Sequence, residues 1–219
     1  MGHLFFRESA PGQKECADGL RQVNLRLQDL EQECLNSELA RQQQQQSASS
    51  MQLSGAGKAA AAAHTDEQLR RLGEAAACIR DCVPRVEAAA RDAPEHLGHS
   101  VVQLVSLLHS LADSGSGAVR AMPREDAGFA QELSVVGAQC RTVLEASGQL
   151  LQAVKEAGGN PAAVANTHSQ VRETAAGTLD VVEDVHGSVQ ELLAKRGSTA
   201  AMVEALHRAV VRVSRTRCL

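Results

Sequence analysis

Two pairs of residues have the spacing that places two metal ligands on one face of a helix. His96 and His99 are three residues apart, and Cys78 and Cys82 are four residues apart. A structural zinc site needs four protein ligands, and a catalytic zinc site usually needs three and a water molecule. Neither pair is accompanied by a CxxC or HExxH motif that would supply the missing ligands. We therefore interpret the histidines as solvated or core residues and the thiols as buried, and we predict no metal site.

Motifs for phosphate binding and for nucleophilic catalysis are equally weak. Residues 157–161 contain a glycine pair, but neither GxGxxG after a strand nor GxxxxGK[ST] occurs. The segment is typical of a helix end followed by a helix start. No local signature of a catalytic nucleophile is present. The sequence therefore predicts a protein without enzyme activity and without a cofactor.

The composition argues against some classes of binding partner. The net charge of −4 argues against nucleic-acid binding, because that binding draws much of its affinity from Lys and Arg at phosphates. A long apolar stretch of the kind that spans a membrane is missing, and so is a secretion signal at residues 1–7. The six cysteines are spread through helical patterns, as reduced thiols are. We expect a cytoplasmic protein that does not insert into membranes.

Apolar residues recur at helical spacing along most of the chain. The first stripe has intervals of 4, 3, 4, 3 and 4 residues and consists of Cys16, Leu20, Val23, Leu27, Leu30 and Cys34. Similar stripes predict helices at about 12–39, 58–92, 96–113, 125–157 and 161–194, with a short extension at 199–213. Five amphipathic helices with short connections pack best as an antiparallel bundle. The predicted fold class is therefore an all-α, antiparallel five-helix bundle with a kinked or extra helical segment at its C-terminal end.

The breaks between stripes set the predicted boundaries. A Gln- and Ser-rich tract predicts a flexible linker at about 41–57, and the Ser-Gly-Ser-Gly run at 114–117 predicts the end of the third helix. Residues 195–198 are expected to interrupt the last helix, and Pro84 to bend the second. The bundle is expected to cover 9–213, between a divergent leader at 1–8 and a basic tail at 214–219.

Four short segments carry a resemblance to a known family. They read APGQKEC at 10–16, LGH at 97–99, KEAGGNP at 155–161 and VEDV at 182–185. In this order and at these separations, they resemble the talin rod, in particular the five-helix bundle that contacts the FERM head in the autoinhibited form. The resemblance runs from about residue 7 to about residue 213, and KEAGGNP is its most specific segment.

The resemblance implies a function and a site. Such a bundle binds the phosphotyrosine-binding-like subdomain of the talin FERM head and masks its integrin-binding surface, in the cytoskeleton at cell-matrix junctions, with actin and integrin as indirect partners. Glu156, the acid of KEAGGNP, is the principal residue carried over, and Gln149, Gln152 and Ala153 are predicted on the same outward face. Acidic residues with a lower claim to the surface are Asp29, Glu31, Asp180, Glu183 and Asp184.

Helix geometry separates some of these acids. Glu183 lies 27 residues beyond Glu156, across a turn, so the last helix carries it roughly 30 Å away. We expect the two to belong to different sites. Two other functions remain open: a mechanically opened bundle that exposes a buried vinculin-binding helix, and a membrane-surface protein that uses the basic end at 208–217.

Overall fold

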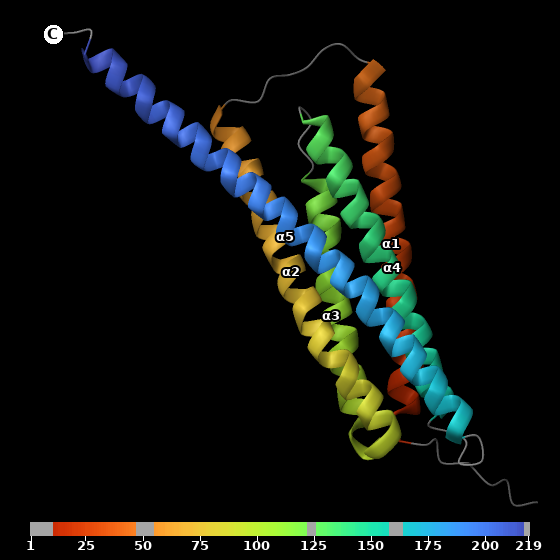
Figure 1. Cartoon of the computed structure of the whole chain (residues 1–219). Coiled ribbons are helices and arrows are strands. Elements are labelled where there is room, and N and C mark those ends of the chain that lie inside the picture. The colour runs from red at the N-terminus through yellow and green to blue at the C-terminus, as the bar shows by residue number, and fades with distance from the viewer. Residues whose placement is uncertain (1–10, 47–54, 122–125, 158–163, 217–219) are drawn as a thin grey trace, which may run out of the picture.

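Five long helices make up the described part of the chain. The computed structural model describes residues 11–46, 55–121, 126–157 and 164–216. The helices are α1 (Gln13–Gln46), α2 (Gly55–Asp92), α3 (Pro94–Arg120), α4 (Ala127–Ala157) and α5 (Val164–Thr216). Consecutive helices run in opposite directions, and no strand occurs within the described ranges (Figure 1). The predicted all-α bundle of five helices is confirmed.

The helix starts follow from local sequence. Pro94 occupies the first turn of α3, where its missing N–H costs nothing, and only Ala93 separates α3 from α2. Asp126 precedes α4, and its carboxylate accepts a hydrogen bond from the backbone N–H of Phe129 at 2.9 Å. This is an N-cap, which satisfies a donor that the first turn leaves free. Both connections therefore fix where the next helix begins.

The predicted apolar stripes form a single core. Leu30, Ile79, Leu108, Leu144 and Val185, one from each helix, are fully buried. Each buried side chain of this size contributes roughly 1.5–3 kcal/mol through removal from water. The core is built from aliphatic residues and contains one aromatic ring, that of Phe129, among the described residues. Helix-to-helix packing of small and branched side chains therefore holds the bundle together.

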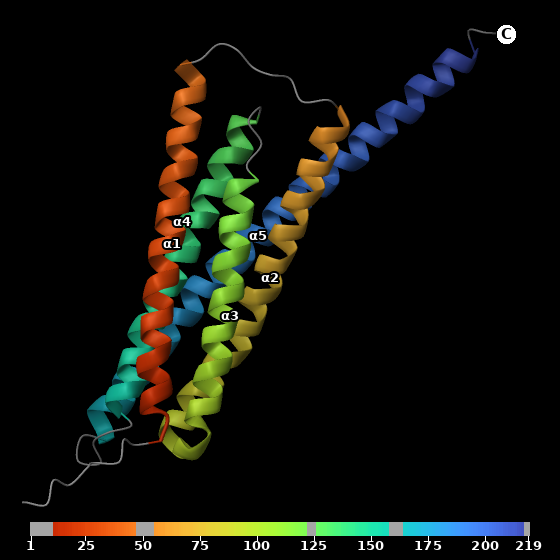
Figure 2. The same ribbon diagram turned by 180° about the vertical axis from the view of Figure 1, so that it is seen from behind.

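The five helices divide into a four-helix unit and one added helix. The pairs α2–α3, α2–α5, α4–α5 and α3–α4 pack against each other, which joins α2, α3, α4 and α5 into one unit. In contrast, α1 packs on α3 and α4 (Figure 2). The seam between α3 and α4 is thus covered by α1, while α2 and α5 cover the other side. Each helix keeps one outward face.

The predicted break at 114–117 is wrong, because α3 continues to Arg120. Ser114, Gly115 and Ser116 are buried against neighbouring helices. A Cβ on Gly115 would lie 3.1 Å from the sulfur of Cys140, so only a small residue permits this approach. The polar, glycine-rich run therefore marks a close helix crossing and not a loop.

The predicted linker at 41–57 is too long. Residues 41–46 complete α1, and residues 55–57 begin α2. Glutamine is a good helix former, so a run of Gln extends a helix that has already started. Residues 47–54, like the predicted leader at 1–8, lie outside the described residues.

The expected interruption at 195–198 is also absent, and α5 is continuous. The ammonium group of Lys195 contacts the carboxylate of Glu132 on α4 at 2.8 Å. The guanidinium group of Arg196 pairs with Asp66 on α2 and lies 4.6 Å from the centre of the Phe129 ring. These contacts hold the helix through Gly197. Beyond them α5 projects from the bundle, and it includes residues 214–216 of the predicted tail (Figure 1). The helix α2 continues through Pro84, so this proline lies inside the helix, where it was predicted.

Candidate protein-binding surface

One outward stripe of α4 carries the principal predicted residue. Its members recur at intervals of 3 and 4 residues, all of them are exposed, and they are Glu145, Gln149, Gln152 and Glu156. Gln152 donates a hydrogen bond through Nε2 to Oε1 of Glu156 at 2.5 Å. This bond between residues one turn apart orients the carboxylate without neutralising it. The predicted exposure of Gln149, Gln152 and Glu156 is confirmed.

Ala153 does not belong to this outward face. Its side chain is 2% exposed, and it lies on the buried face of α4 together with Leu151 and Val154. Because α4 contacts α1, α3 and α5, its buried face is wider than a two-residue stripe. The placement of Ala153 beside Glu156 is therefore corrected: it packs inside, and it reaches no partner directly.

The position of Glu156 leaves its negative charge accessible to a partner. It is the penultimate residue of α4, where the free carbonyl groups already produce a negative potential. No cation of the described chain lies within ion-pair distance of its carboxylate. The adjacent Lys155 is half-buried, and its backbone carbonyl accepts a hydrogen bond from Gln13 of α1. Within the described ranges, Glu156 thus presents a negative charge that no cation pairs with, at one end of the bundle.

The acids of α1 are arranged differently. Asp29 is exposed and lies 3.9 Å from Arg26 on its own helix. Glu31 is half-buried and faces α4, where it lies 3.6 Å from Arg141. Glu31 therefore serves the contact between α1 and α4, and less of its charge is available to a partner.

The acids of α5 form a separate group in the first half of that helix. Asp180, Glu183 and Asp184 are all exposed. Glu183 lies 3.3 Å from Arg80 on α2, so it bridges the contact between α2 and α5. Since α5 starts beside the end of α4, a rise of about 1.5 Å per residue places this group roughly 30 Å from Glu156. The structure does not bring the two acidic groups together (Figure 1).

The residues considered for metal binding are dispersed. His96 and His99 are exposed, and so is Cys78, which corrects its predicted burial. Cys82 is buried, and burial raises the pKa of its thiol above the ordinary value. Across the described ranges, no three of the His, Cys, Asp and Glu side chains form a group able to hold a metal ion. In the same ranges, no helix is both long and apolar enough to cross a bilayer.

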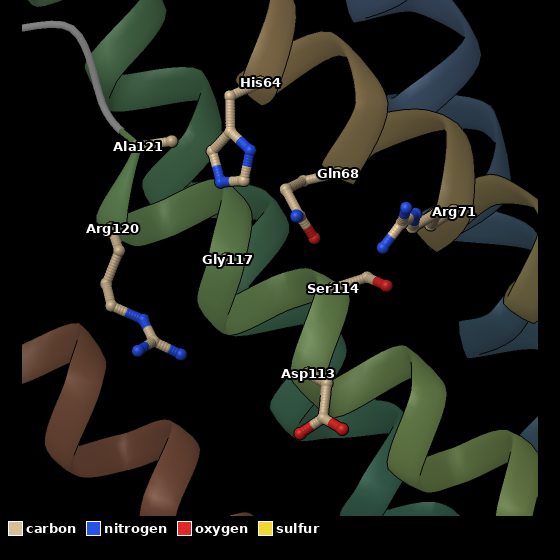
Figure 3. A pocket seen from close by; sticks show the side chains of 8 residues that line it. All are labelled: His64, Gln68, Arg71, Asp113, Ser114, Gly117, Arg120 and Ala121. Atoms are coloured by element: carbon tan, nitrogen blue, oxygen red, sulfur yellow. The ribbon is translucent and has the colours of Figure 1, made fainter. Parts of the chain in front are cut away.

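A groove between α2 and α3 was not predicted. It has a volume of about 510 Å³ and lies near the end of α3, between the side chains of His64, Arg71 and Arg120 (Figure 3). Its α2 and α3 residues are separated by more than 40 positions in the sequence, and the run at 114–117, which supplies two of them, was interpreted as a helix end. Helical periodicity shows which residues face outward but not which helices leave a gap between them.

Five long antiparallel helices with polar outward faces define an all-α bundle module. The family described as "Talin 1-like, rod segment domain" matches residues 12–197, and the chain belongs to this family. The chain is 28% identical over 204 residues to talin of Oscarella pearsei and 26% identical over 207 residues to talin-1 of Gallus gallus. It is also 28% identical over 204 residues to talin-2 of Homo sapiens. These matches cover 93% of the chain and 7% of each talin, so the chain spans a small part of their length.

Proposed function

We propose that the bundle is a rod module of a cytoskeletal adaptor that binds a talin-type FERM head and masks its integrin-binding surface. The observation that carries the proposal is the exposed carboxylate of Glu156 within the KEAGGNP segment, which has no ion-pair partner among the described residues. A basic patch on the phosphotyrosine-binding-like subdomain of the head is the complementary partner. Masking of this kind belongs at cell-matrix junctions, where actin and integrin are reached only through other parts of the adaptor.

The surroundings of Glu156 favour a charge-dependent contact. The carboxylate is exposed, it lies at the negative end of a helix, and Gln152 is the one described residue that is hydrogen-bonded to it. Complementary potentials steer association and determine specificity. Glu145 has the same charge on the same stripe but lies 11 residues earlier, roughly 16 Å along α4. It therefore provides a matched control for position.

The test is a titration of the isolated head with the wild-type chain, Glu156→Lys and Glu145→Lys. Loss of one partner of a buried charge pair costs roughly 2–5 kcal/mol, and exposure at the rim reduces that figure. We expect Glu156→Lys to weaken binding by at least about tenfold and Glu145→Lys to change it little. Raising the salt from 0.1 M to 1 M shortens the Debye length from about 10 Å to about 3 Å, so it should weaken the wild-type complex.

Folding provides the control for this comparison. Both substitutions are at exposed positions, so each should change the free energy of unfolding by less than about 0.5 kcal/mol. Equal loss of affinity in the two variants would contradict the assignment to Glu156. Absence of binding by the wild type would contradict the function itself, and capture of the vinculin head alone would replace it with the mechanically opened bundle.

A further inference from the structure

The groove lies between α2 and α3, near the end of α3. Both α1 and α2 pack on α3. Ser114 and Gly117 form part of the floor, and Gly117 has so little space that an added Cβ would lie 2.7 Å from Oε1 of Gln68. Small residues on α3 thus make the recess, and side chains of α2 and α3 form its walls (Figure 3).

The walls are rich in nitrogen donors. His64 and Arg71 of α2 and Arg120 of α3 surround the floor, and the guanidinium groups of the two arginines lie on opposite sides of Gly117 (Figure 3). Asp113 is the one carboxylate among the described lining residues, and it lies 3.2 Å from Arg26 of α1. The anionic group of the groove is therefore already paired.

Both groove arginines keep donors for a ligand. Arg71 uses Nε to bind Glu67 at 2.8 Å, and Arg120 uses Nε to bind the carbonyl of Ser116 at 3.4 Å. Arg120 also forms an ion pair with Glu33 of α1 at 3.6 Å, a distance at which no N–H donor is used in a hydrogen bond. A guanidinium group has five N–H donors in a planar fork that suits a carboxylate. Each side chain can donate to a further oxygen while it keeps its present partner.

We propose that this groove binds an acidic peptide segment of a partner protein through Arg71 and Arg120. A recess of this volume, with Gln68 and Ser114 as additional hydrogen-bonding groups, fits side chains that enter it from the solvent. A flat anionic membrane cannot follow the recess, and the net charge of −4 opposes attraction to such a surface. A carboxylate on a peptide can enter the recess and can bind the two arginines there.

The proposed groove is independent of the Glu156 surface. It lies at the end of the bundle where α3 ends and α4 begins, whereas Glu156 lies near the other end of α4 (Figure 1). Ala127 and Glu156 are separated by roughly 45 Å along that helix. One bundle can therefore hold a FERM head and an acidic peptide together. A substitution in the groove should leave head binding unchanged.

The experiment uses the full chain and a short fluorescein-labelled peptide of alternating Glu and Ala, read by fluorescence anisotropy. The matched pair of variants is Arg71→Glu and Arg70→Glu. Both arginines are exposed and both bind Glu67, Arg70 at 2.5 Å and Arg71 at 2.8 Å, but only Arg71 lines the groove. The two variants therefore share the change in net charge and the loss of one ion pair to Glu67. Only the position relative to the groove differs.

We expect Arg71→Glu to weaken peptide binding by roughly tenfold, Arg120→Glu to act in the same direction, and Arg70→Glu to change it less than about twofold. Asp113→Asn should strengthen binding about twofold, since it removes a negative charge from the wall of the groove. Equal effects of Arg70→Glu and Arg71→Glu, or equal affinity for a peptide with Gln in place of Glu, would overturn the proposal. So would Arg71-dependent binding only to vesicles of phosphatidylcholine with about one-fifth phosphatidylserine.

Discussion

Glu156 occupies a position where a carboxylate does not help its own helix. Negative charge near a helix C-terminus is unfavourable, typically by about 0.3–1 kcal/mol. The Glu156→Lys substitution should therefore leave the stability of the bundle equal or slightly higher while it weakens head binding. Helix stability does not account for a glutamate at this position, whereas a basic partner surface does.

The exposure of this residue was predictable, and the burial of its neighbour was not. Periodicity from the buried Val154 places Glu156 outward. Ala153 was misplaced because alanine is compatible with both environments, and the number of helices that pack on α4 cannot be seen in its own sequence. The groove arginines were missed for a related reason. Arg71 and Arg120 become neighbours only through the packing of α2 on α3.

His109 provides a prediction about acid. Burial, and to a lesser extent the charge of Arg26, lower the pKa of His109 below the ordinary value of about 6.5, and the nearby Asp113 opposes this. Its Nε2 is buried without a hydrogen-bond partner in the described structure. The unfolded chain therefore binds a proton at a higher pH than the folded chain does. Stability should fall as the pH drops through the ordinary histidine range toward the lowered pKa.

The measurement is urea unfolding of the wild type and His109→Gln at pH 7.5 and at pH 5.5. The other seven histidines are common to both proteins, so the difference between the two pH responses isolates His109. The wild type should lose more stability on acidification than the variant. Parallel losses would show that protonation of His109 is not opposed by the fold.

At the scale of the helix, residue types that usually end a helix occur here inside continuous helices. Ser and Gly at 114–117 read as a loop in the sequence but form a close crossing inside α3. Residues 195–198 read as a break, yet the contacts of Lys195 and Arg196 hold α5 straight through them. Both features depend on partners from other helices. Local signals located the helices well and located their ends less well, because tertiary contacts override weak breaking signals.

Two glycines of α4 test this explanation. A Cβ on Gly137 would lie 3.0 Å from Val119 and 3.2 Å from the sulfur of Cys34, whereas a Cβ on Gly148 would meet nothing within 4 Å. Gly137→Ala should therefore destabilise the bundle by about 1–3 kcal/mol through overpacking. Gly148→Ala should stabilise it by about 0.5–1 kcal/mol, because alanine loses less backbone freedom in a helix.

Thermal or chemical unfolding of the two variants decides the matter. The same chemical change on the same helix should give effects of opposite sign. Two stabilising substitutions would indicate that α1 and α3 have room to move away from Gly137. Two destabilising substitutions would indicate that Gly148 also lies in a contact.

At the scale of the whole molecule, α1 is the least embedded helix. It packs on α3 and α4, and its fully buried apolar side chains are those of Cys16, Val23 and Leu30. It also exposes Leu25, Leu35 and Leu39 to more than half of their surface. By comparison, α4 contacts three helices closely and buries residues along its entire length. The bundle therefore behaves as a four-helix unit with one more weakly held cover.

This arrangement predicts the order in which the molecule opens. Segments with few buried contacts open at lower free energy than the core does. The backbone amides of α1 should exchange with deuterium through a local opening, before those of α3 and α4, whose exchange should require unfolding of the whole bundle.

Hydrogen exchange measured by mass spectrometry at several low urea concentrations tests this order of opening. In α1 the exchange should depend weakly on urea, and in α4 strongly, because opening of α1 exposes less surface. Equal urea dependence in α1 and α4 would mean that all five helices open as one cooperative unit, and that α1 is as firmly held as the helices that it covers.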